Sequence, residues 1–92
     1  VNILKYSLRA LELAKKAALE GNINSISDAG VAALTAYAAS EGAYYNIKIN
    51  LKSIRDTDFS DKIEKEVNQI LNKIKDMTRE VRKLVLEKLS KS

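Results

Sequence analysis

Residues 20–51 read EGNINSISDAGVAALTAYAASEGAYYNIKINL, and this stretch decides the fold of the chain. It opens with a polar loop, residues 21–27, and continues in a segment built largely from Ala, Gly and Ser. A helix with such small side chains can approach neighbouring helices closely on every side. Asn46 and Asn50 are four residues apart, so they share one face of that helix. The stretch therefore predicts a central, closely packed helix that could form the wall of a ligand site.

Composition favours helices throughout. The chain has 92 residues, of which 46% are hydrophobic and 30% charged, as expected for one globular domain. It contains no Pro and only three Gly, so almost nothing interrupts helix formation. We therefore predict an all-α fold, with residues 1–92 forming a single helical domain.

The absence of Cys and His narrows the chemistry that this chain can perform. It cannot supply a disulfide, a thiol nucleophile, a zinc finger or an imidazole base. Any acid–base work falls to carboxylates, Lys or Tyr, or to groups on another chain. No apolar run approaches the roughly 20 residues of a membrane span, and no signal peptide is recognisable, so we expect a cytoplasmic protein that does not bind membranes.

The net charge of +4 comes from Lys and Arg residues that are scattered along the sequence. Nucleic-acid-binding proteins usually carry a basic stripe with stacking aromatic residues, and the sequence shows no such stripe. We therefore expect no nucleic-acid partner. A mildly positive surface would still favour an anionic small molecule.

Two helices are expected before residue 54. Residues 2–20 form the first, with an apolar repeat at three- and four-residue steps, and Gly21 stands where a C-cap is expected. The second should run from about residue 28 to residue 53, with Ser25 or Ser27 as its N-cap. Asp28 would then lie in the first turn, where the helix dipole favours the ionised carboxylate.

Glycines and amides in the second helix indicate close neighbours. Gly30 and Gly42 each cost about 1 kcal/mol relative to Ala inside a helix, so another helix or a ligand should approach closely. Asn46 and Asn50 are either buried amides that neighbouring helices satisfy or groups that bind a ligand. The sequence leaves both possibilities open.

Residues 58–90 are expected to form the third and longest helix, about 50 Å in length. Its apolar residues follow a four-three spacing that is typical of an a/d seam. The seam consists of Ile63, Val67, Ile70, Ile74, Met77, Val81 and Leu84. We expect an up-and-down antiparallel bundle of long helices, elongated, with its apolar faces completed by a second copy in a homodimer or higher homo-oligomer.

Residues 20–59 resemble the cyclodeaminase/cyclohydrolase family, which includes the C-terminal domain of formiminotransferase-cyclodeaminase and bacterial methenyltetrahydrofolate cyclohydrolases. The matching residues are Gly21-Asn22, Ser25, Ser27-Asp28, Val31-Ala32-Ala33, Gly42-Ala43-Tyr44, Asn46, Ile49-Asn50-Leu51, Asp56 and Phe59. The resemblance implies an all-α bundle, a homodimer and a tetrahydrofolate derivative as substrate. It also implies that no metal or redox cofactor is needed.

The activity that the resemblance implies is cyclodeaminase chemistry in folate-dependent one-carbon metabolism. In that reaction 5-formiminotetrahydrofolate closes to 5,10-methenyltetrahydrofolate and ammonia leaves. The alternative within the family is a methenyltetrahydrofolate cyclohydrolase, which opens the methenyl bridge with water. A third possibility is a non-catalytic helical module whose helices serve only oligomerisation.

The resemblance also implies where substrate should bind. We expect Asn22, Ser27, Asp28, Asn46 and Asn50 to line the pocket, with the two amides near the end of the second helix bonding the pterin or holding the loop. Asp28 would orient the substrate or stabilise positive charge on it. The family's catalytic Asp belongs to a segment that precedes the matched stretch and is absent from these 92 residues, so the catalytic residue stays unassigned. We expect the chain to be the C-terminal half of the domain.

Overall fold

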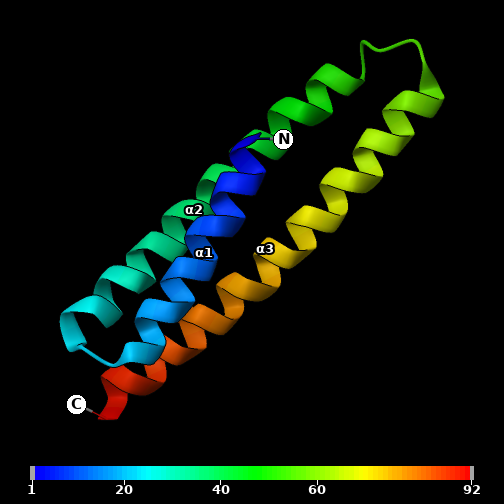
Figure 1. Cartoon of the computed structure of the whole chain (residues 1–92). Coiled ribbons are helices and arrows are strands. Elements are labelled where there is room, and N and C mark those ends of the chain that lie inside the picture. The colour runs from blue at the N-terminus through cyan, green and yellow to red at the C-terminus, as the bar shows by residue number, and fades with distance from the viewer. Residues whose placement is uncertain (1, 92) are drawn as a thin grey trace.

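The computed structural model describes residues 2–91, which form three helices: α1 (Asn2–Glu20), α2 (Ile23–Leu51) and α3 (Thr57–Lys91). The helices run antiparallel in chain order, and each packs against the other two (Figure 1). The bundle measures 55 × 17 × 16 Å. The predicted all-α fold, the up-and-down order and the elongated shape are confirmed.

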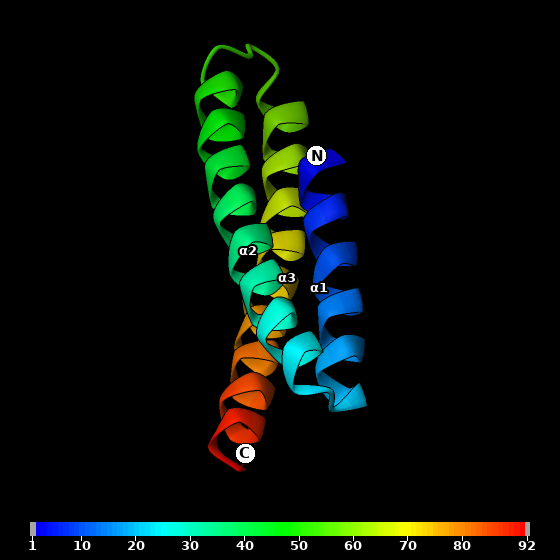
Figure 2. The same cartoon turned by 90° about the vertical axis from the view of Figure 1, so that its left-hand side faces the viewer.

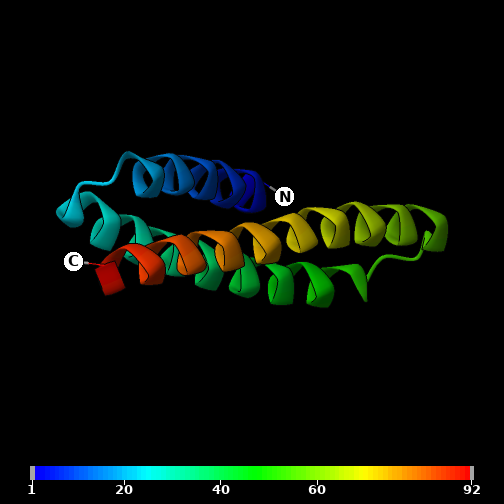
Figure 3. The ribbon, with the colours of Figure 1, turned by 90° about the horizontal axis from the view of Figure 1, so that it is seen from below.

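The helices differ in length, so one end of the bundle consists of only two helices, α2 and α3. α2 has 29 residues and α1 has 19, so α2 is about 15 Å longer at 1.5 Å per residue. The end of α2 that leads into α3 extends past the first residues of α1, as Figures 2 and 3 show. Residues 42–51 of α2 are therefore accompanied by α3 and not by α1.

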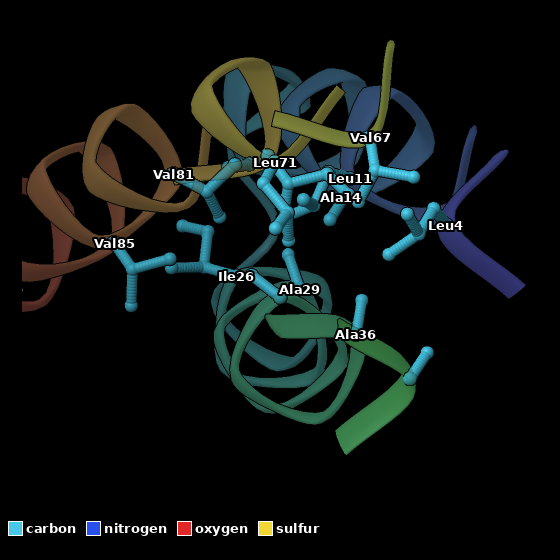
Figure 4. Packing of buried hydrophobic residues seen from close by; sticks show 14 residues of the cluster. Leu4, Leu11, Ala14, Ile26, Ala29, Ala36, Val67, Leu71, Val81 and Val85 are labelled. Atoms are coloured by element: carbon cyan, nitrogen blue, oxygen red, sulfur yellow. The ribbon is translucent and has the colours of Figure 1, made fainter. Parts of the chain in front are cut away.

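The core lies between the three helices (Figure 4). α2 contributes mostly small side chains to it, and its neighbours contribute larger ones. Four of the five buried apolar positions on α2 that face the core are Ala, and only Ile26 is larger. The small residues let α2 approach both partners closely, as the Ala-rich sequence predicts. The buried apolar residues are Leu4, Leu11, Ala14, Ala18, Ile26, Ala29, Ala33, Ala36, Ala43, Val67, Leu71, Ile74, Val81 and Val85.

The predicted seam of α3 is correct in three positions and shifted in others. Val67, Ile74 and Val81 are buried, but Leu71 and Val85 lie deeper than Ile70 and Leu84, which are partly exposed. α3 contacts both α1 and α2, so it buries a stripe that is wider than the strict a/d seam of a two-stranded coil. The seam is covered within the chain and therefore does not itself require a second copy.

The second helix begins earlier than expected, which corrects its cap. α2 starts at Ile23, and the Asn22 side chain is its N-cap, accepting hydrogen bonds from the backbone N–H groups of Asn24 at 2.9 Å and Ser25 at 3.4 Å. Neither Ser25 nor Ser27 is the cap, because Asn is an equally strong capping residue and comes first in the sequence. Gly21 has φ +88° and ends α1 in the left-handed conformation, as predicted.

The two glycines of α2 have different surroundings. A Cβ atom at Gly30 would lie 3.3 Å from Cγ1 of Val85, so α3 approaches closely here, as expected. A Cβ atom at Gly42 would meet nothing within 4 Å. The close neighbour predicted at Gly42 is therefore not supplied by the described part of this chain.

Candidate functional site

An open groove runs between α1 and α2 and is floored by small side chains. Its two sections have volumes of about 410 and 450 Å³, and both include Ala10 and Ala32, so they are continuous. The section near the α1–α2 connection is lined by Ala10, Leu13, Ala14, Ala17, Ser25, Asp28, Ala29 and Ala32. The other section is lined by Ile3, Tyr6, Ser7, Ala10, Ala32, Thr35, Ala36 and Ala39. Such a groove offers an apolar surface with a few polar groups, which is the usual composition of a small-molecule site.

Asp28 is the only carboxylate that lines this groove among residues 2–91. It is exposed and lies in the second turn of α2, because the helix already begins at Ile23. The expectation that Asp28 occupies the first turn is therefore wrong. A charged group in an apolar groove can still attract and orient a cation.

Asn22 and Ser27 lie near Asp28 in the sequence but not in the groove. The Asn22 side chain is engaged as the N-cap of α2. Ser27 precedes Asp28 by one residue, which rotates it about 100° around the helix. Its side chain is exposed and does not line either section of the groove.

Asn46 and Asn50 lie near the opposite end of α2. Both are exposed, and neither side chain makes a hydrogen bond with another residue of the described range 2–91. The alternative that they are buried amides satisfied by neighbouring helices is therefore wrong for this chain. Eighteen residues separate Asn46 from Asp28, about 27 Å along the helix. The structure thus gathers Asp28 and the groove at one end of α2 and leaves the two amides at the other.

A polar contact fixes the end of α2 that carries the amides. The Lys48 ammonium donates to the Glu64 carboxylate on α3 and lies 5.9 Å from the centroid of the Tyr44 ring. The hydrogen bond and the charge of Glu64 raise the pKa of Lys48 above its usual value. This contact holds residues 42–51 against α3 where α1 no longer accompanies them.

Sequence reasoning missed the groove itself. Ser25, Thr35 and Tyr6 add hydroxyl groups to it, and none of them was expected there. The α2 members could have been found, because Ser25, Asp28, Ala32, Thr35 and Ala39 follow a three-four spacing that places them on one face. The contribution of α1 depends on how the two helices pack, which their periodicity alone does not specify.

The described residues offer no metal centre. Within residues 2–91 no three acidic side chains gather closely enough to hold a metal ion. In the same range, no helix combines the length and hydrophobicity that crossing a bilayer requires.

Comparisons with known proteins agree with the resemblance seen in the sequence. The model of the formiminotransferase-cyclodeaminase family matches residues 1–69. A methenyltetrahydrofolate cyclohydrolase from Methylorubrum extorquens is 43% identical over 61 residues, which cover 66% of this chain and 29% of that protein. The match thus spans less than a third of the relative's length. No solved structure matches the chain.

Proposed function

Because the chain belongs to the formiminotransferase-cyclodeaminase family, we propose that it forms part of a site for tetrahydrofolate derivatives in one-carbon metabolism, and that the substrate lies in the groove between α1 and α2. The match to a methenyltetrahydrofolate cyclohydrolase at 43% identity carries the proposal. The composition of the groove supports it independently.

The floor of the groove suits a flat ring. Alanines from both helices leave a smooth apolar surface, and the hydroxyl groups of Ser25 and Thr35 border it. A pterin can lay one face on such a surface while its polar edge reaches the bordering groups. Large side chains would fill this space, so the small residues serve substrate access as well as helix packing.

Asp28 supplies the charge that this chemistry requires. The methenyl bridge of folate is an N–C–N cation, and a protonated formimino group is one as well. A carboxylate at the side of an apolar groove is complementary in charge to either cation. We assign Asp28 the role of orienting the reacting carbon and stabilising its positive charge.

Two reactions are compatible with this role. In the cyclodeaminase reaction N10 attacks the formimino carbon, N10 loses its proton, and the protonated amine leaves as ammonia; the family match favours this reaction. In the cyclohydrolase reaction water attacks the methenyl carbon, a proton is lost, and the bond from that carbon to N5 breaks to give the 10-formyl product. The relative's activity favours the second reaction. Both place a cation at the same carbon, as the product of the first reaction and as the substrate of the second, so Asp28 would stabilise the forming cation in the first and bind and orient the substrate in the second.

Absorbance of the methenyl chromophore tests the proposal with both substrates. Incubation with 5-formiminotetrahydrofolate should raise the absorbance if the chain is a cyclodeaminase, and incubation with 5,10-methenyltetrahydrofolate should lower it faster than buffer alone if it is a cyclohydrolase. Asp28→Asn should lower the rate at least about tenfold, since it removes a charge-assisted interaction worth about 1.5–3 kcal/mol.

The matched control is Asp61→Asn, which removes an exposed carboxylate of α3 that lines neither section of the groove. It should leave the rate unchanged. If the chain accelerates neither reaction and a full-length protein containing it is indifferent to Asp28→Asn, the assigned role of Asp28 is wrong. A non-catalytic oligomerisation module would give that result.

A further inference from the structure

A second groove, between α2 and α3, carries a concentration of positive charge. It has a volume of about 360 Å³ and is lined by Leu34, Tyr37, Lys75, Thr78, Arg79 and Arg82. The cations occupy positions i, i+4 and i+7 of α3, so they share one face. Although basic residues are scattered along the sequence, these three gather on one face of α3.

These three cations are not explained by the stability of the fold. Like charges at i,i+3 and i,i+4 destabilise a helix by a few tenths of a kcal/mol per pair. Lys75 and Arg82 form no ion pair or hydrogen bond with any other residue of the described range 2–91. Arg79 has only a loose contact with Asp76, at 4.0 Å and with both side chains more than 70% exposed.

Two other cations of the bundle form ion pairs with carboxylates of a neighbouring helix. Lys15 of α1 pairs with Glu80 of α3 at 2.7 Å, and Lys48 of α2 pairs with Glu64. Both pairs join neighbouring helices. Lys75 and Arg82 have no comparable partner among residues 2–91, so their charges are available to a ligand in the groove.

The opposite wall of the groove completes a binding surface. Leu34 and Tyr37 come from α2, and the Tyr37 hydroxyl has no partner among residues 2–91, so it can donate a hydrogen bond to a ligand. Thr78 donates its own hydroxyl hydrogen to the backbone oxygen of Ile74 at 2.7 Å. Its oxygen therefore does not contribute a donor to the groove.

We propose that the α2–α3 groove binds a short linear polyanion. Lys75 and Arg82 are seven residues apart, about 10 Å along α3, a spacing that is longer than a single phosphate or carboxylate group. A ligand with two or three anionic groups in a row can contact both, and the arginines favour phosphate or carboxylate groups because their guanidinium donors match these anions. The proposal does not depend on folate binding, since the groove lies on the other side of α2.

Titration calorimetry of the 92-residue chain tests the proposal with two probes, inorganic tripolyphosphate and a blocked triglutamate peptide, at about 20 mM salt so that screening is weak. At least one probe should bind saturably with one molecule per chain. The probe that binds more tightly identifies phosphate or carboxylate as the preferred group.

Variants separate this groove from the net charge of the chain. Lys75→Gln with Arg82→Gln should weaken binding at least about tenfold, through two lost charge-assisted contacts. Arg55→Gln with Lys62→Gln removes the same charge near the α2–α3 connection, about 25 Å away, and should weaken binding less than about twofold. Exchanging the cations, Lys75→Arg with Arg82→Lys, should retain most of the affinity.

Two results would overturn the proposal. One is that neither probe binds saturably to the unmodified chain. The other is equal weakening in the groove variant and the control variant, which would show attraction to net charge alone. Circular dichroism should show unchanged helicity in every variant, because all four substituted side chains are exposed.

Discussion

Asp28 and Asn46 lie on the same face of α2, five helical turns apart, since eighteen residues at about 3.6 per turn return to the same direction. The residues between them on this face are small: Ala32, Thr35, Ala39 and Gly42. Ala32, Thr35 and Ala39 line the groove beside α1. Beyond the groove the face continues at Gly42, where an added Cβ atom would meet nothing within 4 Å in the described chain.

Gly42→Ala should stabilise the isolated chain by about 0.5–1 kcal/mol, because Ala favours the helix and the added methyl group meets nothing within 4 Å. Gly30→Ala should stabilise the chain less than Gly42→Ala does, or destabilise it, because the added Cβ atom would lie 3.3 Å from the Val85 side chain. Urea unfolding followed by circular dichroism measures both changes. A larger gain at Gly30 than at Gly42 would contradict the packing described for α2.

Asn22→Ala should destabilise the chain by about 1 kcal/mol, because two backbone N–H groups of α2 lose their acceptor. Asn22→Asp should restore most of this stability, since Asp is an equally good cap. Ser27→Ala is the matched control and should change the free energy of unfolding by less than about 0.5 kcal/mol. Equal losses for the Asn22 and Ser27 variants would mean that the helix begins elsewhere.

Ile74→Ala should destabilise the chain by about 2–5 kcal/mol, because Ile74 is fully buried and the shorter side chain leaves a cavity. Ile49→Ala makes the same chemical change at a side chain that is 65% exposed, and it should cost less than about 0.5 kcal/mol. Thermal unfolding distinguishes the two. Comparable costs would show that Ile49 is covered in solution.

Self-association of the chain should depend on α2. Exposed apolar side chains that gather on one element can mark a surface that another chain covers, and α2 leaves Val31, Leu34, Tyr45 and Ile49 more than half exposed. We predict that sedimentation equilibrium detects a homodimer or higher homo-oligomer and that Val31→Glu with Ile49→Glu dissociates it.

Leu86→Glu is the control for that experiment, because Leu86 is exposed on α3. It should leave the association unchanged. A chain that is monomeric at all concentrations, or one that dissociates equally with Leu86→Glu, would contradict a role for the outer face of α2.

The sequence predicts the helices well because their signals are local. Periodicity places α1 and α3 within one or two residues of their observed ends, and Gly21 marks the break between α1 and α2. The start of α2 was predicted five residues too late, since several capping residues follow one another there and the first of them, Asn22, prevails. Where several residues could cap a helix equally well, the local sequence does not indicate which of them is the N-cap.

The sites depend on how the helices pack, and here the sequence predicts less. Asp28 could be singled out from its place after the polar loop, but its groove requires Ala10 and Leu13 of α1 at the right height beside α2. Asn46 and Asn50 share one face as predicted, yet their distance from Asp28 follows only from α2 being one unbroken helix. The cluster of Lys75, Arg79 and Arg82 is visible in the spacing of α3, but its opposite wall of Leu34 and Tyr37 is not.

The most direct test of folate binding between α1 and α2 is a titration of the ¹⁵N-labelled chain with 5-formyltetrahydrofolate, a stable derivative, followed by amide NMR spectra. The largest shifts should map to the groove, at Ala10, Asp28, Ala32 and Thr35, and Asp28→Asn should weaken them. Absence of saturable shifts, or shifts confined to the α2–α3 groove, would contradict the proposed location of the substrate.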